Sequence, residues 1–456
     1  MYTFMTKHVL APMLDIFRGT ATMKCLKELE ETQWWPRHKI AELQNERLIQ
    51  LLRYAYDNVP YYHRIFQEQG LKPENIETSA DLVKLPILTK RLIRNNFSDL
   101  VAHDFPKRQL MLRSTGGSTG EPLRFYKTKN DFYNWGSAAE LRAYGWAGYE
   151  LGKKCALVWE TYPYKSTMEK FTRTFRHFLQ RIVLFNALEI SVGKLPLLAK
   201  RLVDFQGGFV RGYPTAIYLL ARFIEREGKP RIGPKAIITS GEQLYDFQRE
   251  LYLKVFECET YSHYGSNEVH AIASECSEHS GYHISAENIV IEIVDGEGKP
   301  VPVGEEGRIL VTNLHNYAMP FIRYETGDIG VISDKACPCG RGLPLLAAVN
   351  GRTADVIFTK SGKRIPGVAL PWGFLASLGV EQFQIVQENY EKVVIKLIID
   401  KEYPRDRIDE MIKEVLRRFT SMLGDDIDVV AELVDQILPT ISGKTRFVLS
   451  NLPERF

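Results

Sequence analysis

A run of glycines and hydroxyl side chains is the strongest local signal for chemistry in this sequence. It consists of Ser114, Thr115, Gly116, Gly117, Ser118, Thr119 and Gly120. Glycines let a backbone approach an oxyanion and turn its N–H groups toward it, and the hydroxyls add further donors. These residue types predict a phosphate cradle, although a flexible turn has the same composition. The Gly-Lys-Ser/Thr ending of a P-loop is missing, which excludes a P-loop NTPase.

Five further motifs follow the glycine-rich run in order. They are Ser240-Gly241-Glu242, Tyr261-Ser-His-Tyr264-Gly265-Ser-Asn-Glu268, Arg323-Tyr-Glu-Thr-Gly-Asp328, Gly351-Arg352-Thr-Ala-Asp355 and Ser442-Gly443-Lys444. Each contributes a carboxylate, an aromatic ring or a cation. Any one of these motifs alone would be weak, because a lone Asp in a turn or a lone Lys usually has only a local role.

Three cysteines and two histidines supply ligands for a soft or borderline metal ion. Cys276, His279 and His283 form one group, and Cys337 and Cys339 form the other. The Cys-x-Cys spacing of the second group is tighter than the common Cys-x-x-Cys. The spacing predicts a structural zinc site as one interpretation and leaves both histidines open as ligands.

The elements that must position these residues change character along the chain. The first hundred residues predict helices, with an apolar stripe from Ile40 to Ala55 that ends near Val59-Pro60. From about 110 to 350, short apolar runs such as 235–239 and 290–294 alternate with helical segments, and Asp295-Gly-Glu-Gly298 predicts a hairpin. Strands at 382–386, 392–399 and 427–433 and a helix at 408–419 predict a small ββαβ unit.

We therefore expect an α/β protein with a large, multi-subdomain N-terminal region of α/β layers and a small C-terminal α+β domain. The predicted divisions are a helical segment over 1–100 that packs on the large domain, a large region over 101–350, and a small domain over 351–456. The length of 456 residues does not limit the size of the core.

Composition excludes several classes of protein. The 59 Lys and Arg residues nearly balance the 56 Asp and Glu residues, so no general basic surface favours nucleic acid. Six cysteines are too few for a disulfide scaffold. Pro12 and Asp15 interrupt the only apolar run near the N-terminus, and we read no signal peptide and no transmembrane helix. We expect a cytoplasmic protein, and a homodimer is kept as an option.

Taken together, the ordered motifs resemble the acyl-adenylate-forming superfamily, and most closely its phenylacetate-CoA ligase branch with the relatives found in capsular polysaccharide gene clusters. The resemblance covers nearly the whole chain, including Leu51-Leu-Arg-Tyr-Ala-Tyr-Asp-Asn-Val-Pro-Tyr-Tyr62. It implies ATP-dependent activation of a carboxylic acid to an acyl-adenylate with release of pyrophosphate, followed by transfer to coenzyme A. The implied ligands are ATP, Mg²⁺, the acid and the acceptor.

The resemblance also implies roles for single residues. The loop from Ser114 to Gly120 would hold the β- and γ-phosphates of ATP, and Tyr264 would lie against adenine beside Gly265 and the Ser240-Gly241-Glu242 motif. Glu268 matches the acid that holds Mg²⁺ on the phosphates, since this hard cation prefers carboxylate oxygen. Asp328 matches the acid that accepts hydrogen bonds from both ribose hydroxyls.

Lys444 is the residue that the resemblance marks for catalysis. A point cation beside the α-phosphate would stabilise the negative charge that spreads over the transferring group. Arg352 and Asp355 lie where the family has its interdomain hinge, and Asp355 would absorb the backbone rotation between two half-reactions.

Two departures from the family bear on the acceptor. Leu123, not lysine, follows Pro122 of the phosphate loop, and the phenylacetate branch also lacks that lysine. The segment from Lys363 to Pro371 replaces the Asn-Val-Phe-Pro type of segment expected of the ligases. The alternatives are therefore transfer to an amine, giving an amide in capsular or surface polysaccharide biosynthesis, and a nucleotide-binding module without catalysis.

The resemblance also implies which residues bind the metal and which residues surround the acid. The Gly-x-His-Ile pattern of the branch selects Gly281-Tyr-His283-Ile284, so the zinc ligands it implies are Cys276, His283, Cys337 and Cys339, with a structural role. Family position places the acid pocket around Trp135, Tyr213-Pro214 and the residues after Ser240. The identity of the acid cannot be read from these residues.

Overall fold

The computed structural model describes residues 1–115, 122–160, 166–228, 233–352, 356–359, 364–400, 403–424, 427–438 and 446–452. The chain divides into two compact units. Unit 1 comprises Met1–Cys155, Lys165–Val183 and Tyr261–Val349, and unit 2 comprises Ala156–Tyr164, Leu184–Thr260 and Asn350–Phe456. Unit 2 thus groups the C-terminal residues with part of the middle of the chain, and the predicted domain boundaries stay a prediction.

Helices dominate the first hundred residues, as predicted. They are α1 (Tyr2–Met5), α2 (Ala11–Arg18), α3 (Thr22–Thr32), α4 (Arg37–Asn58), α5 (Pro60–Glu68) and α6 (Lys90–Asn95). The stripe of α4 is buried as expected, with Leu48, Leu51 and Leu52 fully shielded from solvent. Helix α4 ends at Asn58, and the next residue, Val59, has the extended backbone that a following proline favours.

Two sheets lie in unit 1. Strands β1 (Met111–Ser114) and β2 (Arg124–Lys127) form an antiparallel pair. The larger sheet follows the order β10-β11-β12-β13-β9-β8-β7. Its strands are β7 (Thr260–Ser266), β8 (His270–Glu275), β9 (Tyr282–Ile284), β10 (Ile289–Val294), β11 (Glu306–Asn313), β12 (Tyr324–Ser333) and β13 (Leu345–Arg352). Antiparallel pairing of β10 with β11 confirms the predicted hairpin.

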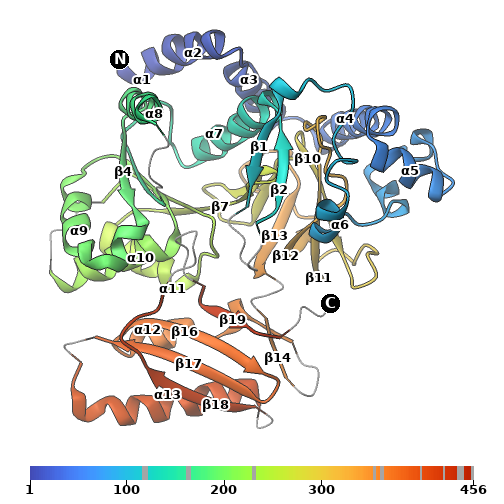
Figure 1. The fold of residues 1–456 in the computed structure, drawn as a ribbon. Helices are drawn as coiled ribbons and strands as arrows, with labels where there is room; N and C mark the ends of the chain where they lie inside the picture. Colours follow the sequence, from blue (N-terminus) through green and yellow to red (C-terminus); the bar gives the residue numbers. More distant parts are fainter. Residues whose placement is uncertain are drawn as a thin grey trace. The chain divides into compact units, whose positions relative to one another are not determined.

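Two further helices belong to unit 1, α7 (Ser137–Trp146) and α8 (Thr167–Leu179). Helix α7 continues from a π-helix, η5 (Asn130–Gly136), and contacts both α3 and β8. One buried cluster joins residues of α4 and α5 to the large sheet, among them Leu51, Phe66, Ile309 and Tyr324. The N-terminal helices therefore close one face of the sheet that carries most of the predicted site (Figure 1).

The first part of unit 2 is a layered α/β structure. Its strands follow the order β6-β5-β3-β4. They are β3 (Cys155–Trp159), β4 (Ile182–Asn186), β5 (Phe209–Gly212) and β6 (Ile237–Ser240), and β5 and β6 are parallel. The helices are α9 (Leu195–Asp204), α10 (Pro214–Arg226) and α11 (Asp246–Phe256). Parallel strands alternating with helices are the pattern predicted for this stretch.

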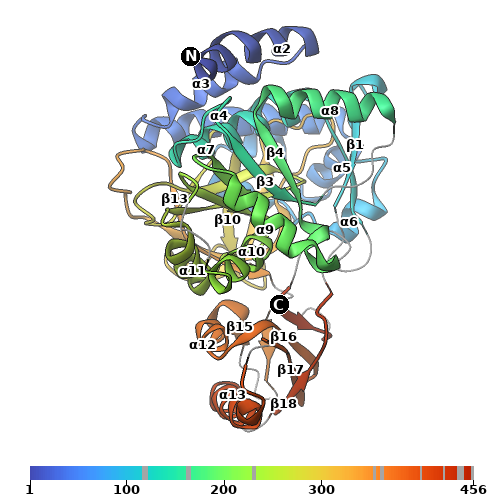
Figure 2. The ribbon, with the colours of Figure 1, turned by 90° about the vertical axis from the view of Figure 1, so that its left-hand side faces the viewer.

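The C-terminal part of unit 2 confirms the predicted ββαβ unit and extends it. It contains β14 (Val356–Phe358), β15 (Arg364–Pro366), α12 (Trp372–Ser377), β16 (Val380–Asn389), β17 (Lys392–Ile399), α13 (Ile408–Leu423), β18 (Asp428–Leu433) and β19 (Val448–Ser450). The sheet order is β18-β17-β16-β19, with α13 beside it (Figure 2). The strand β19, parallel to β16, was not predicted.

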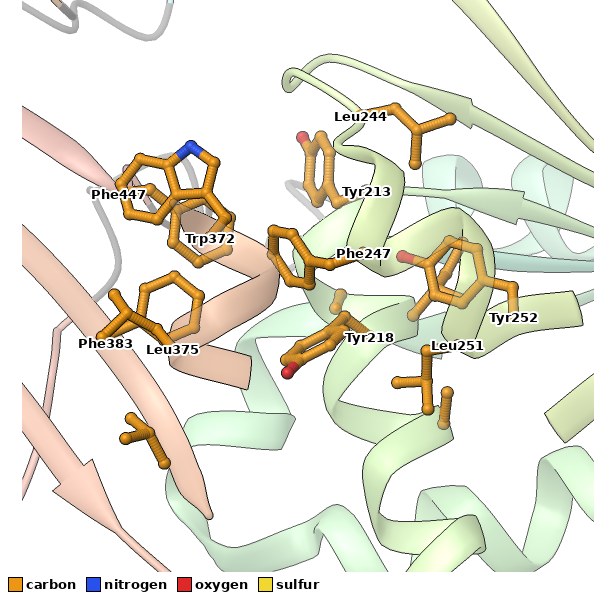
Figure 3. Close-up of a cluster of buried hydrophobic side chains, with 14 of the residues drawn as sticks. Tyr213, Tyr218, Leu244, Phe247, Leu251, Tyr252, Trp372, Leu375, Phe383 and Phe447 are labelled. Atoms are coloured by element: carbon orange, nitrogen blue, oxygen red, sulfur yellow. The ribbon is translucent and has the colours of Figure 1, made fainter. Parts of the chain in front are cut away.

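An aromatic cluster joins the two parts of unit 2. The ring of Phe247 on α11 lies 5.8 Å from that of Phe383 and 6.0 Å from that of Phe447, and Trp372 stacks on Phe383 (Figure 3). Each such ring pair adds roughly 0.5–1.5 kcal/mol beyond the burial of its surface. The fold class, α/β with a separate C-terminal α+β domain, is confirmed, and the mobility of that domain stays a prediction. In the part of the chain that the structure describes, no helix is both long and apolar enough to cross a bilayer.

Candidate active site

The glycine-rich run begins where β1 ends, in a hairpin that Thr115 closes. Ser114 pairs with Arg124 at the end of the β1–β2 ladder. The Thr115 N–H donates to the Leu123 carbonyl at 3.0 Å, and the Leu123 N–H donates to Thr115 Oγ1 at 3.0 Å. The predicted residues Gly116 to Gly120 lie outside the described residues. The β1–β2 pair therefore fixes the positions of the residues on either side of the run, and Thr115 takes part in both hydrogen bonds.

Tyr264 and Asp328 are brought together from two strands, β7 and β12, that are not neighbours in the sheet order. The Tyr264 hydroxyl donates to Asp328 Oδ2 at 2.7 Å. The turn before Asp328 is built by Gly327, whose φ of 83° favours glycine, and by the Asp328 N–H, which donates to Thr326 Oγ1 at 3.1 Å. A carboxylate has about four lone pairs, so it can accept more than one hydrogen bond.

Glu268 lies in the turn between β7 and β8 and is buried. Its Oε1 accepts a hydrogen bond of 2.8 Å from the hydroxyl of the fully buried Tyr324. The bond fixes one oxygen of the carboxylate, and the carboxylate can still act as a ligand for a hard cation. Beside it, Gly265 is tightly packed, since a Cβ at this position would lie 2.7 Å from the His270 carbonyl oxygen.

Lys127 is a buried cation that the sequence reasoning missed. The side chain is fully buried, and its Nζ lies 3.1 Å from Asp131 Oδ2. Burial lowers the pKa of Lys127, while the charges of Asp131, Glu268 and Glu140 act to raise it. In β2, Phe125 and Lys127 are both buried while Arg124 is exposed. Period-two alternation could therefore have placed Lys127 on the inward face of the strand.

The remaining predicted nucleotide residues lie in unit 2. Gly241 has a φ of 85°, and a Cβ there would meet the Tyr213 ring at 2.8 Å, so only glycine fits. The carboxylate of Glu242 accepts a 3.0 Å hydrogen bond from the N–H of Thr215, in the first turn of α10, where an anion is favourable. Ser240 ends β6 and Arg352 ends β13. Asp355 and Lys444 lie outside the described residues.

Two residues predicted near the acid pocket have well-defined neighbours. In unit 1, the Trp135 ring stacks on His315 at 4.2 Å, and the Arg47 guanidinium lies 4.4 Å from the ring centroid. In unit 2, Tyr213 is buried and stacks on Trp159 at 4.1 Å. Both rings are held rigidly, which suits either a pocket wall or a core.

The predicted zinc ligands come together in unit 1. One ligand atom from each of Cys276, His283, Cys337 and Cys339 lies within 4.8 Å of the others. The sulfurs of Cys276 and Cys337 are 3.6 Å apart, and Cys339 Sγ is 3.3 Å from His283 Nε2. Two thiolates each ~2.3 Å from a tetrahedral zinc are about 3.8 Å apart, so the donor set fits. Four protein ligands leave no open position, which favours a structural role.

His279, the rival ligand, is directed elsewhere. Its Nδ1 lies 3.5 Å from Glu275 Oε2. At the cluster, burial lowers the pKa of His283 to about 4, aided by Arg341 and Arg142, which keeps the imidazole neutral as a metal ligand requires. Burial acts to raise the pKa of Cys339, but hydrogen bonds from the backbone and side chain of Arg341 lower it below its usual value.

Comparison with known proteins shows which proteins this chain resembles. Residues 357–451 match the family model described as the CapK C-terminal domain. A phenylacetate-coenzyme A ligase of Thermus thermophilus is 27% identical over 342 residues, which is 72% of this chain and 74% of the relative. Protein CapK of Staphylococcus aureus is 25% identical over 425 residues, which is 90% of this chain and 89% of the relative. The chain is therefore similar over most of its length to phenylacetate-coenzyme A ligases and to CapK. The predictions of this family and of an enzyme of the ligase class are confirmed.

A solved structure supports the fold of this chain. The 2-hydroxyisobutyryl-CoA ligase, in a complex with an acyl-AMP described as the postadenylation state, matches with a TM-score of 0.75 and 20% identity. The match covers 92% of each chain. At this identity the likeness establishes the fold, which agrees with the α/β architecture described above.

Proposed function

We propose that this protein uses ATP to convert a carboxylic acid into an acyl-adenylate and then transfers the acyl group to coenzyme A. In the first step a carboxylate oxygen attacks the α-phosphorus, the bond to the bridging oxygen breaks, and pyrophosphate leaves. In the second step the thiol sulfur attacks the acyl carbon, the bond from that carbon to the phosphate oxygen breaks, AMP leaves with the electron pair, and the thiol proton is released to solvent. The hydrogen bond between Tyr264 and Asp328 carries the proposal, because it joins the predicted adenine and ribose residues in one group.

The residues of unit 1 would bind the nucleotide. The Tyr264 ring would lie against adenine, with its hydroxyl anchored on Asp328, and Asp328 would accept from the ribose hydroxyls. The hairpin neck at Thr115 would hold the phosphate loop in place. Glu268 would hold the magnesium ion, which supplies neutralising charge on the phosphates. Tyr324 keeps the Glu268 carboxylate in one orientation.

Lys444 would stabilise the charge that develops on the α-phosphate. The test is acid-dependent release of pyrophosphate, with hydroxylamine as the trap for the acyl-adenylate. We expect Lys444→Ala to bind ATP but to lose release by about two to three orders of magnitude. The matched control is Lys413→Ala, an exposed lysine in the same C-terminal region. Equal loss in both variants, or no loss in Lys444→Ala, would contradict this role.

An experiment must identify the acid substrate, because no residue that the structure describes identifies it. A panel of aryl, acyl and sugar acids, assayed with the unmodified protein, covers the classes that a rigid aromatic wall could accept. If the protein binds ATP but releases pyrophosphate with none of these acids, a nucleotide-binding module without catalysis replaces the proposed enzyme.

The second candidate function is transfer of the acyl group to an amine. It rests on the resemblance to capsular polysaccharide relatives, and residues 357–451, which by that resemblance move to admit the nucleophile, match the CapK C-terminal domain. An acid that supports pyrophosphate release is incubated with coenzyme A or with amines of amino sugars and amino acids. A coenzyme A-dependent thioester supports the first candidate, and an amide formed without coenzyme A supports the second.

We also propose that zinc occupies the cysteine–histidine cluster as a structural ion. The closed set of four ligands supports this role. The ion would tie the end of β8 to the loop between β12 and β13, since Cys276 follows β8 and the other two thiols lie in that loop.

A further inference from the structure

Unit 1 exposes two helical segments with large apolar side chains, which we call the phenylalanine face. The first segment contains α1 and α2, and the second is α8. The exposed members of the face are Phe4, Met13, Ile16, Phe17, Met168, Phe171, Phe175 and Phe178. Phe17 is 89% exposed and Phe178 is 74% exposed. A monomer in water seldom gathers so many large apolar side chains on one surface.

Helix α8 exposes its apolar side chains to solvent, whereas a helix on the surface of a globular protein usually buries them. Met168, Phe171, Phe175 and Phe178 recur every three or four residues and therefore share one side. All four are exposed, and the rings of Phe171 and Phe175 stack at 6.1 Å. Partly buried residues, such as Arg173, lie on the other side. An ordinary surface helix buries its apolar side, so this orientation indicates a surface that is covered in the cell.

The two segments are attached to each other. The Tyr2 hydroxyl of α1 donates to the carbonyl of Leu179, the last residue of α8, at 2.8 Å. The guanidinium of Arg181 lies 5.3 Å from the centre of the Tyr2 ring. In Figure 1 the blue helices α1 and α2 lie next to α8. The two segments therefore lie side by side in unit 1, and both expose apolar side chains.

The charges around the phenylalanine face are mostly positive. The two segments contain Lys7, Arg18, Lys170, Arg173 and Arg176 against Asp15 and Glu169, and Arg181 follows the second segment. Lys7 is paired with Glu30, and Arg173 and Arg176 are partly buried, so the exposed cations here are Arg18, Lys170 and Arg181. Asp15 accepts hydrogen bonds from the Thr20 hydroxyl and the Met23 N–H, so its charge is turned to the α2–α3 connection. A covering partner of complementary charge must be anionic.

This charge distribution decides whether a second copy of the protein or a lipid surface covers the face. In a symmetric dimer the same patch meets itself, so a second copy would place one cationic surface against another. An anionic lipid surface attracts lysine and arginine and accepts phenylalanine, methionine and isoleucine at the level of the headgroups. The combination of outward aromatic side chains with basic neighbours is that of a helix which lies in a membrane interface.

We propose that the phenylalanine face docks this protein peripherally on an anionic lipid bilayer, with α2 and α8 in the interface plane. The docking surface uses none of the residues assigned to ATP, the acid or the cysteine–histidine cluster. The proposal is therefore independent of the reaction that the protein performs.

Vesicle flotation of the purified full-length protein tests the proposal. The vesicles contain either phosphatidylcholine alone or phosphatidylcholine with about one-third phosphatidylglycerol. We expect flotation with the anionic vesicles, at least about tenfold weaker binding to phosphatidylcholine, and a decline in binding as salt is raised. If the protein does not float with anionic vesicles, or floats equally with both, the proposal is wrong.

A matched set of variants assigns any binding to this surface. Phe171→Ser/Phe175→Ser should lower the affinity for anionic vesicles by about tenfold or more, because each exposed ring loses its apolar burial. Lys170→Glu/Arg181→Glu should lower it by a further factor of about five per residue. Val303→Ser and Leu253→Ser are controls, since both side chains are exposed and lie outside the face. Circular dichroism and ATP binding should be unchanged in all variants.

Light scattering without lipid measures the oligomeric state and so tests the alternative in which a second copy of the protein covers the face. If the protein is a dimer that Phe171→Ser/Phe175→Ser converts to a monomer, and vesicle binding is absent, the face is an interface between copies and lipid docking is excluded. If the control variants lose vesicle binding as much as the phenylalanine variant does, the face is likewise excluded as the docking surface.

Discussion

The hydroxyl of Tyr264 is 2.7 Å from Oδ2 of Asp328, although 64 residues separate them in the chain. Because the bond links a ring to a carboxylate, it orients both groups at once. A nucleotide bound here would contact the ring with its base and the carboxylate with its sugar. The two residues should therefore act as a unit in ATP binding.

Tyr264→Phe keeps the ring and removes the hydroxyl. We expect the KM for ATP to rise by about tenfold with a smaller change in kcat, because a hydrogen bond to a charged group contributes about 1.5–3 kcal/mol. Tyr54→Phe is the matched control, since Tyr54 donates to Asp104 on the exposed surface of the same unit. Pyrophosphate release at varied ATP gives both constants. An unchanged KM in Tyr264→Phe would show that the bond does not serve the nucleotide.

The ion pair between Lys127 and Asp131 is fully buried, and breaking it should destabilise the protein. Lys127→Met leaves the Asp131 carboxylate without its cation, and we expect the free energy of unfolding to fall by about 3–5 kcal/mol. In Lys84→Met, which breaks an exposed pair with Asp81, the loss should be under about 1 kcal/mol. Urea unfolding measures both variants. Equal losses would mean that burial does not distinguish the two pairs.

His315 should make the stability of unit 1 sensitive to acid. Burial, aided by the charge of Arg47, holds the pKa of His315 well below its ordinary value, and its neighbours Trp135 and Asn288 carry no charge. The unfolded chain binds a proton there below about pH 6.5 and the folded chain does not. Stability present above this pH is therefore lost as the pH falls.

The loss amounts to about 1.4 kcal/mol between roughly pH 7.5 and 5.5. Urea unfolding at both pH values measures it. In His315→Gln the difference between the two pH values should shrink by about this amount, whereas His38→Gln, at an exposed histidine, should behave as the unmodified protein. If His315→Gln retains the full pH dependence, another group is responsible.

The cysteine–histidine cluster should contain about one equivalent of zinc. Metal analysis of the purified protein measures the content, and Cys337→Ser should lower it below about half an equivalent and reduce thermal stability. Cys155→Ser, at a buried cysteine outside the cluster, should retain the zinc. Little zinc and four reactive thiols in the unmodified protein would exclude the site.

The sequence by itself determined the local structure and the family. Helix α4, the β10–β11 hairpin and the strands and helix of the C-terminal unit follow from periodicity, because apolar residues on one face must be buried together. The short strand β19 escaped prediction, since its three residues are too few to show a period and it depends on pairing with β16.

Only the tertiary structure decided which distant residues meet. Spacing left His279 and His283 as equal candidates, and the fold places His283 beside three thiols while His279 lies near Glu275. Alternation in β2 could have placed Lys127 on the inward face, but its pairing with Asp131 could not be predicted from the sequence. The outward direction of the phenylalanines on α8 could not be predicted either, because periodicity shows that residues share a face but not what covers that face. The neighbours of a face are set by chain folding over hundreds of residues.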